Sequence, residues 1–143
     1  MNTLSRRCLA LALLLSATFA QADEARLVVT IKDIRDATGN LRVSLYADAE
    51  SFRKEDRALK AVSIPAARGE ARITFDGLAP GRYALMAYHD ENADAKLNLR
   101  LGMFPTEGYA LSNNPKVMGP PKFADSAFEV TAPETEANLT LSY

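Results

Sequence analysis

Apolar residues recur at every second position through most of this chain, and this spacing constrains its fold more than any other feature. In 27–34, for example, Leu27, Val29 and Ile31 fall on one face. Successive side chains of an extended strand point to opposite faces, so the pattern predicts a half-buried strand. It recurs in five further stretches, at 41–47, 61–66, 70–77, 126–132 and 138–143, and a seventh stretch, 82–89, is apolar at almost every position. About seven short strands separated by turn residues are typical of an all-β antiparallel sandwich.

The same pattern predicts how some of these strands are placed. The stretch 82–89 is apolar on both faces, as a central strand would be. Residues 67–69 could close a hairpin between two neighbouring strands, and 48–60 has the spacing of a short surface helix joining the two sheets. Strict alternation directs Tyr46 outward and Tyr143 toward the core.

Residues 1–22 have the features of an export signal. A basic start at Arg6 and Arg7 is followed by an apolar run, which ends in a small-x-small sequence whose last residue is Ala22. The run is shorter than the ~20 residues of a membrane-spanning helix and leads into a cleavage sequence. We therefore expect a signal peptide cut after Ala22, which leaves 23–143 as one soluble domain in the periplasm or outside the cell. A retained anchor is the alternative.

The composition of the remaining chain excludes several classes of protein. The single cysteine, Cys8, lies in the expected signal peptide, so a disulfide scaffold, a thiolate metal site and a cysteine nucleophile are not expected. The 17 basic residues of the full chain are outnumbered by 18 acidic ones and form no block, so the electrostatic footprint of nucleic-acid binding is missing. We expect no membrane insertion after cleavage.

Oxygen-bearing side chains follow one another closely after the strand at 82–89. Their positions match five of the ligand positions in a twelve-residue calcium loop, with Lys96 contributing its backbone carbonyl: Asp90, Asn92, Asp94, Lys96 and Asn98. The match is incomplete, because Ala95 stands where such loops need glycine and Leu101 stands where they need a bidentate glutamate. Asp and Asn also cap turns without any ion, and we favour that structural interpretation over a weak calcium site.

The only histidine, His89, ends the strand at 82–89. As a catalytic base it would need an orienting carboxylate and a nucleophile. Ser112 and Asp125 are present, but no nucleophile elbow or triad spacing accompanies them. We therefore interpret His89 as a packed or capped side chain and expect a protein that is not an enzyme, with a small hydrolase or isomerase using His89 as the least favoured alternative.

The segment 90–125 is long, weakly periodic and rich in proline and glycine. Segments of this length inside a compact domain are usually functional or ordered excursions. It contributes most of the candidate ligand-binding residues: His89, Glu107, Tyr109, Ser112, Asn113, Asn114 and Phe123. Aromatic and amide groups on a stiff loop could bind a small molecule, a glycan or an envelope protein. The alternative, which we favour, is that Tyr109 and Phe123 pin the loop to the core.

Two resemblances accompany this interpretation. The stretch 75–85, with Leu78, Pro80, Gly81 and Tyr83, resembles the L-x-P-G-x-Y turn of transthyretin-like sandwiches. Four blocks resemble the domain of unknown function 2141 family of exported bacterial proteins: 88-YHDEN-92, 96-KLN-98, 107-EGYALSNN-114 and 119-GPPKFADSAFEV-130. That family has glycine where this chain has Ala95. The resemblance implies a transthyretin-like or immunoglobulin-like sandwich of the cell envelope and carries no established reaction. We thus expect a binding or interaction module whose surface is formed by 89–123.

Overall fold

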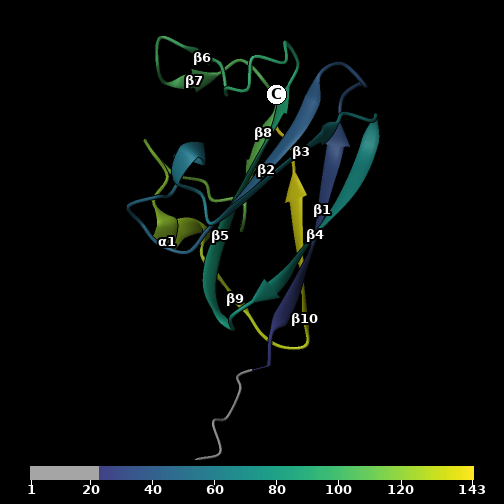
Figure 1. Cartoon of the computed structure of the whole chain (residues 1–143). Coiled ribbons are helices and arrows are strands. Elements are labelled where there is room, and N and C mark those ends of the chain that lie inside the picture. Colours follow the sequence, from purple (N-terminus) through teal and green to yellow (C-terminus); the bar gives the residue numbers. More distant parts are fainter. Residues whose placement is uncertain (1–22) are drawn as a thin grey trace, which may run out of the picture.

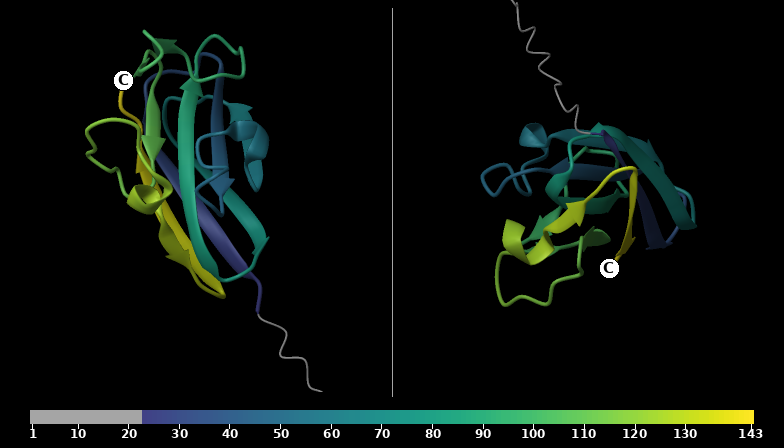
Figure 2. Two further views of the ribbon diagram at one scale, coloured as in Figure 1. Left: turned by 90° about the vertical axis from the view of Figure 1, so that its left-hand side faces the viewer. Right: turned by 90° about the horizontal axis from the view of Figure 1, so that it is seen from below.

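The structure is a computed structural model that describes residues 23–143, so the signal peptide predicted for 1–22 lies outside the described residues. Two β-sheets pack face to face, and the predicted all-β sandwich is confirmed (Figure 1). A short helix lies on the side of the larger sheet that faces away from the smaller one, and a smaller hairpin lies beyond one end of the sandwich (Figures 1 and 2).

The smaller sheet has the strand order β10 (Glu134–Thr140), β1 (Ala25–Ile34), β4 (Gly69–Leu78). The predicted inner residues of β1, Leu27, Val29 and Ile31, are all fully buried. β1 runs antiparallel to β4 but parallel to β10, so the structure departs from a purely antiparallel arrangement at this one pair. The chain enters β10 by crossing from the other sheet, which brings it in beside the start of β1.

The larger sheet has the order β3 (Lys60–Pro65), β2 (Asn40–Tyr46), β5 (Gly81–Asp90), β8 (Tyr109–Leu111). β9 (Phe128–Val130) also pairs with β5, next to its first residues, while β8 pairs with its last part. β5 is therefore central, and most of its residues on both faces are buried, as its sequence predicts.

The core lies between the sheets and contains the alternating residues of their inner faces. Its largest fully buried apolar side chains are Leu27, Ile31, Ile34, Leu41, Leu45, Leu78, Leu85 and Leu139. At roughly 1.5–3 kcal/mol for each fully buried large apolar side chain, this layer supplies the main favourable term in folding.

A second apolar cluster covers the outer face of the larger sheet. Tyr46, predicted to point outward, is 1 % exposed because it is part of an apolar cluster in which Phe52 packs on it and Phe123 packs on Phe52. The ring centroids of Tyr46 and Phe52 are 5.5 Å apart, and those of Phe52 and Phe123 are 5.9 Å apart, both edge to face. Burial raises the pKa of the Tyr46 phenol to about 12. Tyr46 therefore points outward from the inter-sheet core as predicted, but it is not exposed to solvent.

Three connections differ from their predicted form. Residues 67–69 do not close a hairpin, because β3 and β4 belong to different sheets. The segment 48–60 joins β2 and β3 of one sheet, and its predicted helix is reduced to a 3-10 turn at Glu55–Arg57. The Pro80–Gly81 turn crosses between the sheets, and Tyr83 anchors it by donating its hydroxyl to the carbonyl of Ala79 at 2.7 Å.

The segment 90–125 is ordered into short elements. It contains the hairpin of β6 (Leu99–Arg100) and β7 (Phe104–Pro105), then β8, then the single helical turn α1 (Phe123–Ser126). The two last predicted strands are shifted, with β9 and β10 both ending earlier than expected. Tyr143 consequently lies outside the inter-sheet core and is 48 % exposed, contrary to its predicted inward position.

Candidate functional site

The loop of residues 90–98, which we call the Asx loop, leaves β5 at one end of the sandwich. Its first residue, Asp90, is buried, and its two carboxylate oxygens accept the backbone N–H groups of Asp94 at 3.1 Å and Ala95 at 2.9 Å. Ala95 has a φ of +62°, the left-handed conformation that favours glycine. The loop is thus closed on the side chain of its own first residue.

Three further side chains of the predicted metal-binding set lie together on the exposed side of the Asx loop. Asn98 donates its amide N–H to Asp94 at 2.9 Å, and Asn92 donates to Asp94 at 3.2 Å and to the Asn98 amide oxygen at 2.9 Å. These bonds, with that from Asn98 foremost, hold the pKa of the Asp94 carboxyl below its usual range. The Lys96 backbone N–H also bonds Asp94, at 2.9 Å.

Glu107 ties the Asx loop to the segment that follows the β6–β7 hairpin. It is 5 % exposed, and its two carboxylate oxygens accept the backbone N–H groups of Glu91 and Asn98, each at 3.0 Å. One buried carboxylate therefore holds both ends of the loop. A carboxylate that accepts two backbone hydrogen bonds in this way is well satisfied without a ligand.

His89 lies fully buried beneath the Asx loop. Its Nε2 is 2.6 Å from the carbonyl oxygen of Thr38, and its Nδ1 is 2.8 Å from the hydroxyl of Tyr143. A carbonyl oxygen can only accept, so Nε2 carries a proton, and in the neutral ring Nδ1 accepts the proton of Tyr143. The Tyr143 hydroxyl in turn accepts the backbone N–H of Arg35 at 2.9 Å. His89 is thus the packed, hydrogen-bonded side chain that we favoured.

Two carboxylates flank the His89 ring. Asp36 lies 3.8 Å from Nε2 and Glu91 lies 3.8 Å from Nδ1. The backbone N–H of Thr38, which bonds Asp36 at 2.8 Å, keeps the pKa of that carboxyl low, and Glu91 pairs with Arg35. Asp36, His89 and Glu91 each have a ligand atom within 4.8 Å of the other two, close enough to share one metal ion. Both His89 nitrogens already have hydrogen-bond partners, however, so an ion would have to displace one of them.

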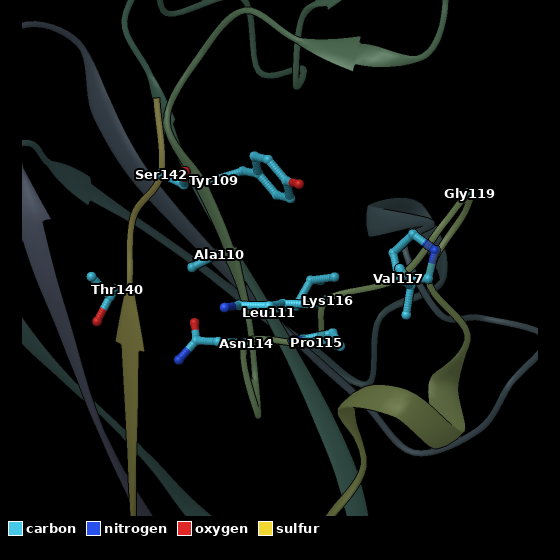
Figure 3. Close-up of a pocket in the computed structure, with 11 residues that line it drawn as sticks. Tyr109, Ala110, Leu111, Asn114, Pro115, Lys116, Val117, Gly119, Thr140 and Ser142 are labelled. Carbon is cyan, nitrogen blue, oxygen red and sulfur yellow. The ribbon is translucent and has the colours of Figure 1, made fainter.

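A pocket of about 290 Å³ opens between β8, the end of β10 and the loop of residues 112–122 (Figure 3). Two of the predicted ligand-binding residues, Tyr109 and Asn114, line it. The rest of its wall combines stiff prolines with small, hydroxyl and basic residues, at Ala110, Leu111, Pro115, Lys116, Val117, Gly119, Pro121, Thr140 and Ser142. The backbone bridge between Tyr109 and Ser142 brings the edges of the two sheets together at its side.

The other predicted ligand-binding residues have structural contacts elsewhere. The hydroxyl of Ser112 accepts the backbone N–H of Leu85 at 2.9 Å, filling the gap between β8 and β9 along β5. Asn113 donates to the carbonyl of Ala127 at 3.0 Å, and Phe123 packs on Phe52. The structure therefore separates the predicted set into groups at the pocket, at the Asx loop and in the packing between strands.

Sequence reasoning missed the groups that come from distant parts of the chain. Thr38 and Tyr143 meet His89 across 51 and 54 positions, and Arg35 meets Glu91 across 56. Thr140 and Ser142 complete the pocket from β10 and the residues after it. One local signal was available for the first group, because Gly39 beside Thr38 has a φ of +67° and its missing side chain allows the backbone of Asp90 to approach.

Fold and site together define a small two-sheet β-sandwich protein that has a polar loop and an open pocket at neighbouring places on its larger sheet. The chain belongs to the family described as Uncharacterized protein conserved in bacteria (DUF2141), whose model matches residues 29–138. The matched span takes in nearly all of the sandwich, the Asx loop and most of the pocket wall. No curated protein and no solved structure matches the chain. Among residues 23–143, no helix is long and apolar enough to cross a membrane.

Proposed function

We propose that the protein is a non-enzymatic binding module of the bacterial cell envelope, and that it takes its ligand in the pocket between β8, β10 and the 112–122 loop. The observation that carries the proposal is the composition of this wall. The aromatic ring of Tyr109 comes from β8, and the amide of Asn114 and the ammonium of Lys116 come from a loop stiffened by proline; all three line the same pocket (Figure 3). Pockets that combine an apolar surface with a few oriented polar groups are the usual form of ligand sites.

The wall also limits the class of ligand. A volume of about 290 Å³ is at the lower end of small-molecule sites. Lys116 favours an anionic group, and the hydroxyls of Thr140 and Ser142 add hydrogen-bond donors and acceptors opposite it. A sugar unit, a small organic acid or an extended segment of an envelope protein would satisfy this set. We place the protein in the envelope because of the export signal expected in 1–22 and the bacterial family.

The experiment is native mass spectrometry of protein purified from its own cell envelope, with a search for a co-purifying small mass. The variant Tyr109→Ala removes the aromatic side of the pocket and should lose the mass, as should Asn114→Ala. Asn138→Ala is the matched control, since Asn138 is exposed on β10 and does not line the pocket. A mass retained by both pocket variants, or no mass in wild-type protein from any envelope preparation, would contradict the proposal.

The location has its own test. Amino-terminal sequencing of protein recovered by osmotic shock should begin at Asp23 if the expected signal peptide is cut after Ala22. Recovery in the cytoplasmic fraction with residues 1–22 intact would contradict export while leaving the pocket proposal open to the first experiment.

A second candidate function is weak calcium binding at the Asx loop. The observation in its favour is that Ala95 adopts the left-handed conformation of a glycine position, which gathers Asn92, Asp94 and Asn98 on one side. To hold a cation, the two amides would have to rotate so that their oxygens, not their N–H groups, face Asp94. Adding millimolar calcium to chelated protein should then raise its melting temperature by mass action, and Asp94→Ala should abolish the rise. An unchanged melting temperature contradicts this candidate.

A further inference from the structure

The tip of the β6–β7 hairpin exposes an unusual amount of apolar surface. Leu101 is 80 % exposed, Met103 69 % and Phe104 55 %, and Leu99 beside them is 44 % exposed. Single exposed apolar residues are normal on a protein surface, but four within six residues form a patch, and such patches mark interaction sites. The hairpin has only two paired residues on each strand, so these side chains are not needed to form a core.

A second exposed apolar tip lies on the 112–122 loop. Met118 is fully exposed, and Val117 beside it is 38 % exposed. The hairpin projects beyond one end of the sandwich, and this loop projects from the outer side of the larger sheet, away from the smaller one (Figures 1 and 2). We call the two tips together the apolar tips. Leu101, Met103, Phe104 and Met118 do not line the pocket, although Val117 does, and the tips project from the molecule, so their shape fits a surface and not a segment inserted into a cleft.

The charge around the apolar tips differs from that of the rest of the chain. From Asp94 to Asp125 there are four exposed basic residues, Lys96, Arg100, Lys116 and Lys122, against two exposed acidic residues, Asp94 and Asp125, and the buried Glu107. Within residues 23–143, none of these four basic side chains forms an ion pair with a carboxylate. A chain with more acidic than basic residues thus presents positive charge beside its exposed apolar side chains.

We propose that the apolar tips dock the protein on the surface of a bilayer that contains anionic phospholipid. Leu101, Met103 and Phe104 would enter the region between headgroups and acyl chains, while Lys96 and Arg100 remain among the phosphates. Apolar burial combined with attraction to anionic lipid is the general basis of binding at a membrane interface. The contact is peripheral and reversible, and no segment crosses the bilayer. It does not require the ligand proposed for the pocket, although Lys116 and Val117 lie at the border of both surfaces.

A second copy of the chain fits this surface less well. A symmetric dimer would bring the same patch of each copy together, and so would place the four basic side chains of one copy against the same four of the other. Repulsion between them would oppose the association. An anionic surface removes that repulsion, and the charge complementarity therefore selects lipid as the occupant.

The test is co-sedimentation with vesicles of phosphatidylethanolamine and phosphatidylglycerol, compared with vesicles of neutral phosphatidylcholine. Wild-type protein should bind the anionic vesicles, and added salt should weaken the binding. Leu101→Glu should reduce the partition coefficient about tenfold or more by placing a charge where an apolar side chain inserts. Leu59→Glu is the matched control, because Leu59 is 52 % exposed and lies outside the tips, and it should bind nearly as wild type does.

Charge and insertion can be measured separately. Arg100→Gln should weaken binding to anionic vesicles about fivefold, while Arg68→Gln, an exposed residue of the turn between β3 and β4, should have little effect. The chain contains no tryptophan, so Phe104→Trp provides a single fluorescent reporter. Its emission should shift to shorter wavelength on adding anionic vesicles. As a control, Leu59→Trp places the single tryptophan outside the apolar tips, and its emission should not shift.

Three results would overturn the proposal. One is failure of wild-type protein to bind anionic vesicles at low salt. Another is equal binding by wild type and Leu101→Glu. The third is a concentration-dependent dimer, seen by sedimentation without lipid, that Leu101→Glu abolishes, which would assign the tips to a second copy. Tyr109→Ala, aimed at the pocket, should bind vesicles as wild type does, so the two proposals can fail separately.

Discussion

The Asx loop and the β6–β7 hairpin follow each other in the chain, yet they treat their side chains in opposite ways. In the Asx loop, polar side chains bond to the loop itself, and Asp90 accepts two backbone N–H groups while almost fully buried. In the hairpin, apolar groups are turned outward, with Leu101 the most exposed. Buried polar groups that are fully bonded hold a structure together, whereas exposed apolar groups cost free energy unless something covers them. The closed loop therefore supports the fold, and the open hairpin is left for binding.

The largest expected effect is a loss of stability from a substitution at Gly39, which lies against the first residue of the Asx loop. Gly39 has a φ of +67°, and a Cβ there would lie 2.0 Å from the carbonyl oxygen of Asp90. Gly39→Ala should reduce the free energy of unfolding by about 3 kcal/mol, through the left-handed backbone and the displaced strand end together. Gly102→Ala is the matched control in the hairpin, because Gly102 has a φ of +68° and nothing within 4 Å. It should lose only about 1 kcal/mol in urea denaturation. Equal losses would contradict the contrast between the regions.

The second prediction removes the Glu107 carboxylate, which holds both ends of the Asx loop. Glu107→Ala leaves the backbone N–H groups of Glu91 and Asn98 without their acceptor. We expect a loss of about 2 kcal/mol in the free energy of unfolding. Glu70→Ala, at an exposed position, should stay within about 0.5 kcal/mol of wild type. A neutral Glu107→Ala would mean that the loop ends are held in some other way.

The third prediction concerns the Tyr143 hydroxyl, which is hydrogen-bonded to His89. Tyr143→Phe removes a donor to His89 and an acceptor for Arg35, and should cost about 1 kcal/mol at neutral pH. Burial raises the pKa of the Tyr143 phenol in the folded protein. The stability linked to it is therefore complete below its usual value near 10 and is lost as the pH rises through the raised pKa.

Urea denaturation at neutral pH and at about pH 11 would measure this dependence. Wild type should lose more stability between the two than Tyr143→Phe does. Tyr46, whose pKa is also raised, contributes the same alkaline loss to both proteins, so the comparison isolates Tyr143. Identical alkaline losses would show that the phenol is not held in the folded structure.

The sequence predicted these two regions unequally, for a physical reason. The contacts inside the Asx loop join residues two to six positions apart, and Asp and Asn make such contacts by themselves. The turn of 90–98 was therefore predictable. His89, by contrast, finds Thr38 and Tyr143 across more than 50 positions, and no local pattern encodes that meeting.

The fold shows the same division. Period-two spacing predicted the strands and the buried faces of β1 and β2, because alternation follows from strand geometry. It could not say that residues 67–69 cross between sheets instead of closing a hairpin, since both connections join two alternating strands. Nor could it say that Phe52 packs on Tyr46, because alternation gives the direction of a side chain but not what lies above it.

The fourth prediction stabilises the closed loop. Ala95 has a φ of +62°, and Ala95→Gly should raise the free energy of unfolding by about 0.5–1 kcal/mol by relieving the left-handed backbone, less the entropy that glycine adds to the unfolded chain. Ala67→Gly is the control, because Ala67 is an exposed turn residue outside the left-handed region, and it should lose about 0.5–1 kcal/mol. Both variants would be compared with wild type by thermal or urea unfolding. If both changed the free energy of unfolding in the same direction, the prediction would be contradicted.

The smallest expected effect is at the open tips. Leu101→Ser and Met118→Ser should each change the free energy of unfolding by less than about 0.5 kcal/mol, because neither side chain is buried in the fold. Leu85→Ala, in the core, should cost about 2–5 kcal/mol in the same urea denaturation. A loss above 1 kcal/mol at Leu101 would mean that the hairpin packs on the sandwich and is not open. If neither substitution lowers the free energy of unfolding, then leucine and methionine at these tips do not stabilise the fold. Their exposed apolar surface would then be explained by what the protein binds.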